Sequence, residues 1–208
     1  MDKKLKIALA QLNPLVGDVS GNIEKLISIR SNLNNDIDIL VAPELYVSGY
    51  PKDDLVLRED FLNLVESEIN KLVKCTKDNK SAIIVGAPRK DNNHIKNSVF
   101  VIENGNIVSI KDKYELPNTG VFDEQRIFKQ GSLEDCVIIK GIKFGLPICE
   151  DIWEKTVLEK LSKSGAEIII AINASPFTVS KNEERENIAT LRVNETKLPI
   201  VYLSLIHI

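Results

Sequence analysis

The stretch Ile37-Asp38-Ile39-Leu40-Val41-Ala42-Pro43-Glu44-Leu45 is an apolar run that stops at a proline and then presents a carboxylate. A short apolar run bounded in this way predicts a buried β-strand. Apolar residues recur at helical spacing on both sides of it, over residues 23–33 and 60–74. A strand between two such helices is typical of an α/β domain.

Further strands and helices continue this pattern along the chain. Helical spacing predicts a short helix that ends at Gly165 and another over residues 183–197. The turn Glu103-Asn104-Gly105-Asn106 contains an Asn-Gly pair, which is a strong hairpin signal. Such hairpins favour a layered sandwich of helices on mixed sheets over a plain Rossmann sheet. Apolar runs predict strands at residues 6–12, 82–86, 98–102, 107–110, 137–139, 142–148, 167–173 and from 200 onward.

The remaining segments give the expected domain organisation. Residues 116–126 have no clean period and are expected to form a long loop. No internal repeat or low-complexity linker divides the chain, so we expect one domain over residues 1–202. Residues 203–208 are mostly apolar and follow the last strand without a cap or turn. Since a domain seldom ends inside an apolar strand, we expect the domain to be truncated and residues 203–208 to be an atypical, artefactual tail.

The composition argues against several kinds of partner. The 208 residues carry a formal net charge of −3 with dispersed Lys and Arg side chains, so no nucleic-acid partner is expected. No apolar run reaches the length of a membrane span and no cleavable signal peptide is recognisable, so no membrane partner is expected. Cys75, Cys136 and Cys149 are widely spaced and form no CxxC pair, which fits a reduced, cytoplasmic protein.

Motifs for phosphate and metal chemistry are absent from the sequence. It contains no GxxxxGK[ST] loop and no GxGxxG after a strand, so no ATP or dinucleotide site is expected in this domain. Two histidines, His94 and His207, are too few for a common zinc site, so no metal or other cofactor is expected here. The same scarcity argues against a Ser-His-Asp or Cys-His catalytic arrangement.

Three polar residues, Glu44, Lys113 and Cys149, stand at the ends of predicted strands. Taken singly, each has an ordinary explanation, as a solvated carboxylate, a surface lysine in a charged run, or an inert buried thiol. Strand ends converge at one edge of a sheet, however, where α/β proteins place their sites. A carboxylate that takes the thiol proton and an ammonium that stabilises an oxyanion would complete an acyl-transfer site without histidine.

Three blocks around these residues are similar to the nitrilase (carbon-nitrogen hydrolase) superfamily. They occur in the family's order as Ala42-Pro43-Glu44-Leu45 with Gly49-Tyr50-Pro51, then Lys113-Tyr114-Glu115-Leu116-Pro117-Asn118, then Cys149-Glu150-Asp151-Ile152-Trp153. Within the superfamily, the chain most resembles the glutaminase domains of glutamine-dependent NAD synthetases, through residues 7–14, 116–126 and 173–177. The resemblance implies a nitrilase-like αββα sandwich that hydrolyses the side-chain amide of glutamine to glutamate and ammonia.

The resemblance also implies a role for each site residue. Cys149 resembles the nucleophile that forms a glutamyl thioester, Glu44 the general base, and Lys113 the cation that stabilises the oxyanion. Supporting roles fall to Glu124, as a second carboxylate, and to Glu150, whose backbone N–H would face the oxyanion. The implied glutamine-binding positions are Ser175 and Lys181 at the α-amino and α-carboxyl end, Trp153 as a pocket wall, and Thr119 where the family commonly has an aromatic residue. For Trp153, a place in the core is an equally good interpretation.

The same resemblance implies partners beyond these 208 residues. Glutamine would be the substrate, and a synthetase domain of the same full-length chain would use the ammonia, with ATP and Mg²⁺, to amidate deamido-NAD. A homo-oligomer is also expected. Two alternatives stay open: a stand-alone amidase or nitrilase acting on a small amide or nitrile, and a non-catalytic fragment that serves as an interaction module or does not fold alone.

Overall fold

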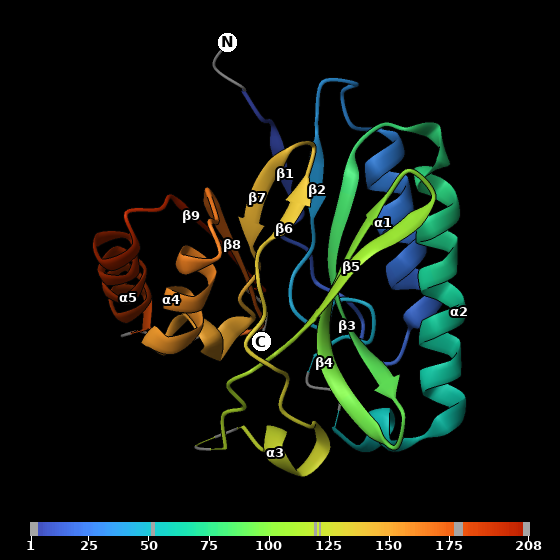
Figure 1. Ribbon diagram of the computed structural model, residues 1–208. Helices are drawn as coiled ribbons and strands as arrows, with labels where there is room; N and C mark the ends of the chain where they lie inside the picture. Colours follow the sequence, from blue (N-terminus) through green and yellow to red (C-terminus); the bar gives the residue numbers. More distant parts are fainter. Residues whose placement is uncertain (1–3, 51–52, 119, 121, 177–180, 206–208) are drawn as a thin grey trace.

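Two β-sheets lie face to face between two pairs of helices in the computed structural model, which gives an αββα sandwich (Figure 1). The structure describes residues 4–50, 53–118, 120, 122–176 and 181–205. The strands are β1 Ile7–Leu9, β2 Ile39–Val41, β3 Ala82–Asp91, β4 His94–Glu103, β5 Asn106–Asp112, β6 Val137–Ile139, β7 Ile142–Gly145, β8 Ile168–Asn173 and β9 Ile200–Ser204. The α-helices are α1 Val19–Ser31, α2 Glu59–Cys75, α3 Glu124–Ile127, α4 Lys155–Lys163 and α5 Lys181–Thr196. Short 3-10 helices lie at Asp53–Leu57, Thr76–Asp78 and Cys149–Ile152.

The first sheet has the strand order β1-β2-β3-β4-β5. Its first three strands run parallel, and β3, β4 and β5 pair antiparallel. Helices α1 and α2 cover the outer face of this sheet (Figure 1). There Ile23 and Leu26 of α1 and Leu72 of α2 belong to one apolar cluster with Leu40 and Ile83 of the sheet.

The second sheet has the order β6-β7-β8-β9, with β6 and β7 antiparallel and the other pairs parallel. Helices α4 and α5 lie on its outer side (Figure 1). Val157, Leu158 and Leu161 give α4 its apolar face, and they cluster with Ile169 and Ala171 of β8.

The inner faces of the two sheets share a third apolar cluster. In β2, Ile39 and Val41 join this inner cluster, whereas Leu40 belongs to the cluster of α1 and α2, as the period of two in a strand requires. Phe144 and Ile170 reach the inner cluster from the second sheet. Since both faces of these central strands are buried, their sequences read as unbroken apolar runs.

The structure confirms the predicted α/β sandwich and its Asn-Gly hairpin, in which Asn104 and Gly105 have positive φ values of 51° and 75°. Strands β3 and β4 form another hairpin, which the sequence did not predict. Strand β3 continues to Asp91 and β4 begins at His94, whereas the prediction ended one strand at residue 86 and began the next at 98. Pro88 and the charged residues after it hid the continuing pair, because both are unusual inside a strand.

Three further predictions of element ends differ from the structure. The strand predicted over residues 142–148 stops at Gly145, before Pro147, whose nitrogen cannot donate to the ladder. The loop predicted over residues 116–126 ends in the short helix α3. Leu203 and Ser204, expected in the tail, continue β9, while residues 206–208 lie outside the described residues.

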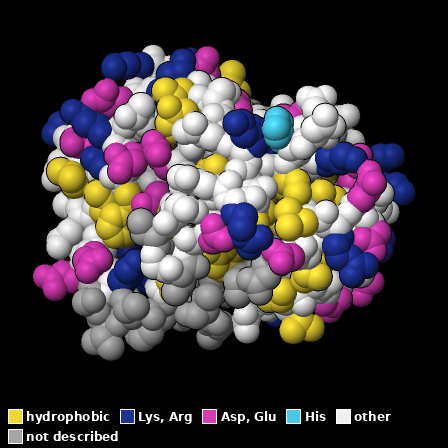
Figure 2. Space-filling model, turned by 90° about the horizontal axis from the view of Figure 1, so that it is seen from below, with side chains coloured by type: hydrophobic (Ala, Val, Ile, Leu, Met, Phe, Trp, Pro, Cys, Tyr) yellow, Lys and Arg dark blue, Asp and Glu magenta, His cyan; other side chains and the backbone are white. Residues whose placement is uncertain are grey.

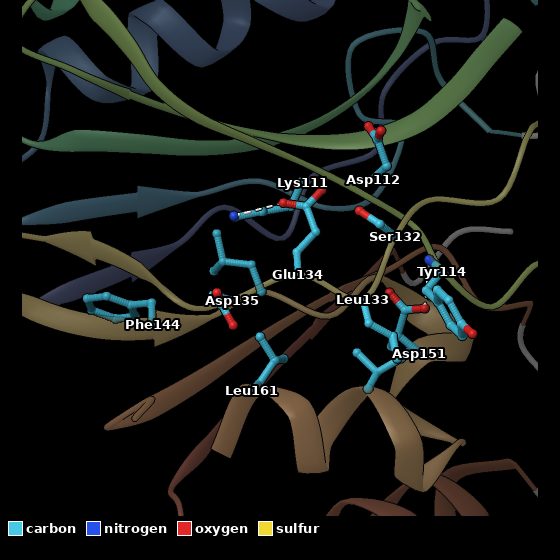
Figure 3. A pocket seen from close by; sticks show the side chains of 12 residues that line it. Lys111, Asp112, Tyr114, Ser132, Leu133, Glu134, Asp135, Phe144, Asp151 and Leu161 are labelled. Carbon is cyan, nitrogen blue, oxygen red and sulfur yellow. Dashed lines mark hydrogen bonds and ion pairs between the residues drawn. The ribbon is translucent and has the colours of Figure 1, made fainter. Parts of the chain in front are cut away.

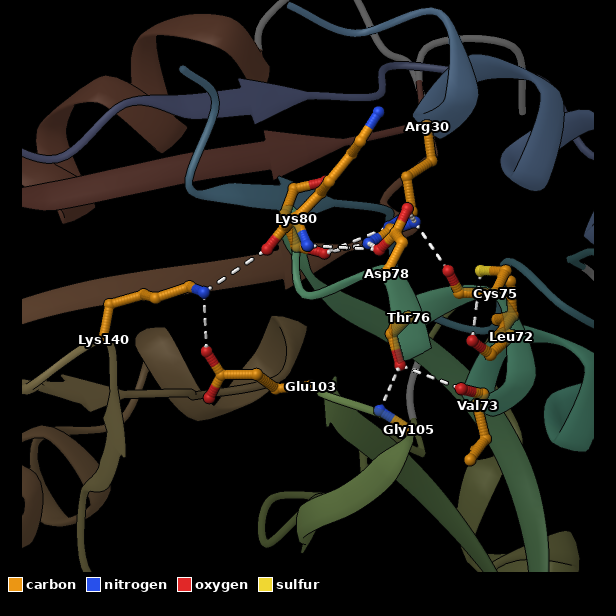
Figure 4. A network of polar contacts seen from close by, with 11 residues as sticks. Arg30, Leu72, Val73, Cys75, Thr76, Asp78, Lys80, Glu103, Gly105 and Lys140 are labelled. Carbon is orange, nitrogen blue, oxygen red and sulfur yellow. Dashed lines mark hydrogen bonds and ion pairs between the residues drawn. The ribbon is translucent and has the colours of Figure 1, made fainter. Parts of the chain in front are cut away.

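A polar network joins the two sheets at the N-terminal ends of β3 and β7 (Figure 4). The Nζ atom of Lys140, in the turn before β7, lies 3.0 Å from Glu103 Oε1 and donates to the carbonyl oxygen of Lys80 at 3.3 Å. Beside it, buried Arg30 donates to the two carboxylate oxygens of Asp78 at 3.0 and 2.7 Å. These contacts hold the two sheets together at one end. Glu44 and Cys149, which follow β2 and β7, lie at the opposite end.

The surface agrees with the mixed charge of the sequence. On the described part of the face in Figure 2, side chains of Lys and Arg alternate with those of Asp and Glu, and hydrophobic side chains form small separate groups. Within the described residues, no helix is long and apolar enough to cross a membrane.

Candidate functional site

Glu44 is held in a tight turn after β2. The following residue, Leu45, has a φ of 48°, which is rare for a residue with a Cβ atom. Strand β3 packs so closely on this turn that a Cβ atom on Gly86 would lie 2.6 Å from the Cα of Glu44. Only glycine allows that approach, and Glu44 is consequently 1% exposed.

Lys113 follows β5 and brings two carboxylates together. Its Nζ lies 2.8 Å from Glu44 Oε1 and 2.9 Å from Glu124 Oε2, and its side chain is fully buried. Burial alone would lower the pKa of Lys113, but the charges of Glu44 and Glu124 outweigh it and raise that pKa well above its usual value. The ammonium therefore stays charged throughout the physiological range.

Asn97 of β4 supports the same ion pair. Its side-chain Nδ2 donates to Glu44 Oε1 at 2.8 Å, and its carbonyl oxygen accepts the backbone N–H of Lys113 at 2.8 Å. With one residue touching both, the carboxylate and the ammonium keep a fixed mutual position.

Cys149 follows β7 and begins the 3-10 helix Cys149–Ile152. Its φ of 48° is again positive, and the residue is 3% exposed. Burial raises the pKa of the Cys149 thiol well above its usual value, and the negative charge of Glu44 raises it further, while Lys113 acts in the opposite direction. The thiol thus needs a base before it can act as a nucleophile.

Residues after β8 connect Cys149 with Glu44. The backbone N–H of Ala174 donates to Glu44 Oε2 at 2.8 Å, and the next residue, Ser175, places its Oγ 3.6 Å from Cys149 Sγ. The carboxylate and the thiol are therefore attached to adjacent residues of one segment. The ends of β2, β5, β7 and β8 meet at this point, as expected for an α/β site.

A cavity of about 140 Å³ opens onto the thiol. Of the residues predicted for the site, Cys149, Glu150, Trp153, Ser175 and Lys181 line it, whereas Thr119 lies outside the described residues. Burial raises the pKa of the Glu150 carboxyl, which lines this cavity. Trp153 also packs partly against the apolar cluster of α4 and β8, so it both lines the cavity and contacts the core. The lining also includes four residues for which the sequence predicted no role in the site: Pro117, Phe122, Glu184 and Arg185.

Two further buried polar residues were missed from the sequence. Asn97 lay just outside the predicted strand at residue 98, and a single asparagine there carries no recognisable signal. Asp151 was noticed only as part of the block around Cys149. Its place in that block, two residues after the thiol, was the one signal that it belongs to the site.

The positive φ at Cys149 leads to a prediction about stability. Replacing Cys149 with glycine is expected to give a free energy of unfolding about 1 kcal/mol higher than replacing it with alanine, because alanine keeps the steric cost of this backbone conformation. Urea denaturation of the two variants measures the difference. As a matched control, Ala171→Gly in β8, where φ is not positive, is expected to lower stability. A Cys149→Gly variant that is less stable than Cys149→Ala would contradict the prediction.

Comparison with known proteins gives a consistent family assignment. The family model for carbon-nitrogen hydrolases matches residues 6–204. The glutamine-dependent NAD(+) synthetase of Aquifex aeolicus is 36% identical over 203 residues, which cover 97% of this chain and 36% of that protein. The protein of the same name from Thermotoga maritima is 35% identical, with 98% of this chain and 36% of that protein covered. This chain thus spans little more than a third of the length of these relatives.

Solved structures share the fold. The glutamine-dependent NAD+ synthetase from Acinetobacter baumannii superimposes with a TM-score of 0.89 at 32% identity, covering 98% of this chain and 38% of that chain. An amidase from Nesterenkonia sp. gives a TM-score of 0.82 at 17% identity, covering 97% and 76%, a similarity that concerns the fold alone. Together with the family match over residues 6–204, the geometry around Cys149 leads to one conclusion: the chain belongs to the carbon-nitrogen hydrolase family.

Proposed function

We propose that this chain is a glutaminase domain, which hydrolyses the side-chain amide of glutamine and supplies the ammonia to the synthetase domain of a longer NAD synthetase. The observation that carries the proposal is the buried Glu44–Lys113 ion pair at 2.8 Å, linked through Ala174 and Ser175 to the Cys149 thiol. Relatives at 35–36% identity, named glutamine-dependent NAD(+) synthetases, support the choice of glutamine.

In the first half of the proposed reaction, Glu44 takes the proton of the Cys149 thiol as the sulfur attacks the amide carbon. Negative charge then develops on the amide oxygen, where the Lys113 ammonium and the backbone N–H of Glu150 stabilise it. When the tetrahedral intermediate collapses, the C–N bond breaks and Glu44 returns its proton to the leaving nitrogen. Ammonia departs, and the glutamyl group remains on sulfur as a thioester.

In the second half, Glu44 takes a proton from a water molecule while the water oxygen attacks the thioester carbon. The C–S bond then breaks, the sulfur recovers a proton from Glu44, and glutamate leaves. Glu124 acts as the supporting carboxylate, because its contact with Lys113 at 2.9 Å keeps the ammonium charged and in place.

The proposed glutamine pocket is the cavity beside Cys149. Lys181 supplies a positive charge for the α-carboxylate, and Ser175 a hydroxyl for the polar end of the substrate. Trp153 walls the cavity, and Thr119 is proposed for the same wall. Arginine and carboxylate side chains at Arg185 and Glu184 line it as well, which suits a substrate that carries both charges.

The remaining parts of the proposal concern the longer protein. Residues 1–202 would form the glutaminase domain, and the synthetase domain would bind ATP and Mg²⁺ and use the ammonia. No cofactor is proposed for the glutaminase domain itself. We further propose a homo-oligomer in the cytoplasm, where the free cysteines Cys75, Cys136 and Cys149 would stay reduced.

A substrate comparison tests the proposal. Ammonia release from glutamine is expected to have a kcat/KM at least about 100-fold higher than release from butyramide, which has the same reactive amide without the charged α-groups. Lys181→Met should raise KM for glutamine and leave butyramide unchanged. Butyramide or a small nitrile consumed faster than glutamine would instead identify a stand-alone amidase or nitrilase.

A further inference from the structure

Asp151 is a buried carboxylate that the proposed reaction does not use. It is 3% exposed and accepts three backbone hydrogen bonds. Its Oδ1 accepts from the N–H of Tyr114 at 3.1 Å and of Glu115 at 2.7 Å, and its Oδ2 accepts from the N–H of Ile148 at 2.9 Å. All three donors are backbone N–H groups, of which the Ile148 N–H is buried and the other two are partly buried.

The three donors belong to the two segments that carry the reactive groups. Tyr114 and Glu115 directly follow Lys113, at the end of β5 in the first sheet. Ile148 directly precedes Cys149, after β7 in the second sheet. One side chain therefore ties the backbone beside the ammonium to the backbone beside the thiol, across the interface between the sheets.

The surroundings of Asp151 leave little room for a substitute. A cavity of about 20 Å³ lies next to it, with Tyr114 and Asp151 side by side at one end (Figure 3). Such a space holds about one water molecule, which cannot replace three well-directed acceptor contacts. Burial raises the pKa of the Asp151 carboxyl to about 7, while its bonds with the three backbone N–H groups act in the opposite direction.

The hydrogen bonds of Asp151 stabilise a strained turn at Cys149. A residue with a φ of 48° is disfavoured by its own sterics and keeps that conformation only when its neighbours hold it. The bond from Ile148 N–H to Asp151 closes the turn around Cys149, in the way that the third residue of a helix commonly reaches back to the capping residue.

We propose that Asp151 is a positioning residue, which holds the Cys149 turn and the Lys113 segment in register so that the ammonium faces the oxyanion formed at the thiol. This inference rests on the proposed function, because it assigns to Lys113 and Cys149 their parts in amide hydrolysis. Asp151 itself touches neither substrate nor the reacting atoms.

The Asp151→Asn variant in the intact protein tests whether the Asp151 carboxylate holds the two segments together. The amide keeps one acceptor oxygen but turns an N–H₂ group toward a backbone donor. We expect amide hydrogen exchange at Tyr114, Glu115 and Ile148 to accelerate about tenfold. We also expect kcat for glutamine to fall about tenfold or more, with KM within about twofold of wild type. The kcat is calculated per active site, and active sites are counted by alkylation of the Cys149 thiol.

Asp78→Asn provides the matched control, since Asp78 accepts two hydrogen bonds from the buried Arg30 side chain. This pair lies at the other end of the sheets, far from the site. This variant should lower the unfolding midpoint without changing exchange at Tyr114 or kcat. A second pair of variants tests the same hydrogen bonds by removing a backbone donor instead of the Asp151 acceptor. Glu115→Pro deletes the N–H that lies 2.7 Å from Asp151 Oδ1, whereas Glu115→Ala keeps it, so only the proline variant should reproduce the loss of kcat.

The outcomes separate the two proposals. Unchanged amide hydrogen exchange in Asp151→Asn would show that Asp151 does not hold the two segments together. Faster exchange with an unchanged kcat would overturn its positioning role. If the wild-type protein hydrolyses no amide, the proposed function fails, and hydrogen exchange still decides whether Asp151 holds the two segments together.

Discussion

Replacing Cys149 with alanine is expected to lower ammonia release from glutamine by at least about 10⁴-fold, since the proposed thioester forms on the Cys149 sulfur. Among the described residues, Cys149 is the thiol that lies in the cavity and within 3.6 Å of Ser175 Oγ. The variant should still fold, because alanine fits the space left by the thiol. Ammonia release, measured with a coupled glutamate dehydrogenase assay, gives the result directly.

The intact protein offers a sharper form of this experiment. In a protein with both domains, Cys149→Ala should abolish NAD synthesis from glutamine and leave NAD synthesis from added ammonia unchanged. Cys75→Ala and Cys136→Ala are matched controls, because both thiols are only partly buried and lie outside the cavity. Ammonia release that persists in Cys149→Ala and disappears in a control would show that the nucleophile has been misassigned.

The candidate site shows which features a sequence reveals. Glu44 and Cys149 were found because an apolar run that stops at a polar residue is a local signal of a strand end. The contact that unites them is not local: the Ala174 N–H reaches a Glu44 oxygen across 130 residues of chain. No periodicity can predict such a register, because it depends on how two sheets pack.

Local patterns also explain what was missed in the fold. The extension of β3 and β4 contains Pro88 and several charged residues, so its pattern resembles a loop although the strands remain paired up to Asp91 and His94. Asn97 lies in β4 and Asp151 in the 3-10 helix Cys149–Ile152, and each is an ordinary polar residue beside other polar residues in the sequence. Their importance comes from the partners that tertiary structure gives them, Glu44 for the first and three backbone N–H groups for the second.

The Lys113→Met variant is expected to lose stability as well as activity. Lys113 is fully buried between Glu44 and Glu124, so its removal leaves two buried carboxylates without a cation. Breaking a buried ion pair from one side costs about 3–5 kcal/mol, and we expect the free energy of unfolding to fall by that amount at pH 8. Ammonia release should fall by about 10³-fold, because the oxyanion loses its cation.

Urea denaturation at pH 6 and pH 8 tests the cause of this loss. The pKa of Lys113 is raised in the folded wild type, so its contribution is complete below about pH 10 and does not change between these two values. In the variant, the two carboxylates repel each other, and the folded state takes up a proton that the unfolded state does not. Its stability should therefore fall as the pH rises, so that the loss relative to wild type is larger at pH 8 than at pH 6.

Two further variants separate the buried network from an ordinary loss of charge. Lys111→Met removes a half-buried lysine that lies 2.9 Å from Glu134 and should cost less than about 1 kcal/mol, because partly exposed pairs contribute little. Adding Glu124→Gln to Lys113→Met should recover part of the lost stability, since it removes one of the two carboxylates left facing each other. A double variant no more stable than Lys113→Met, with no dependence on pH, would show that repulsion between Glu44 and Glu124 is not the cause.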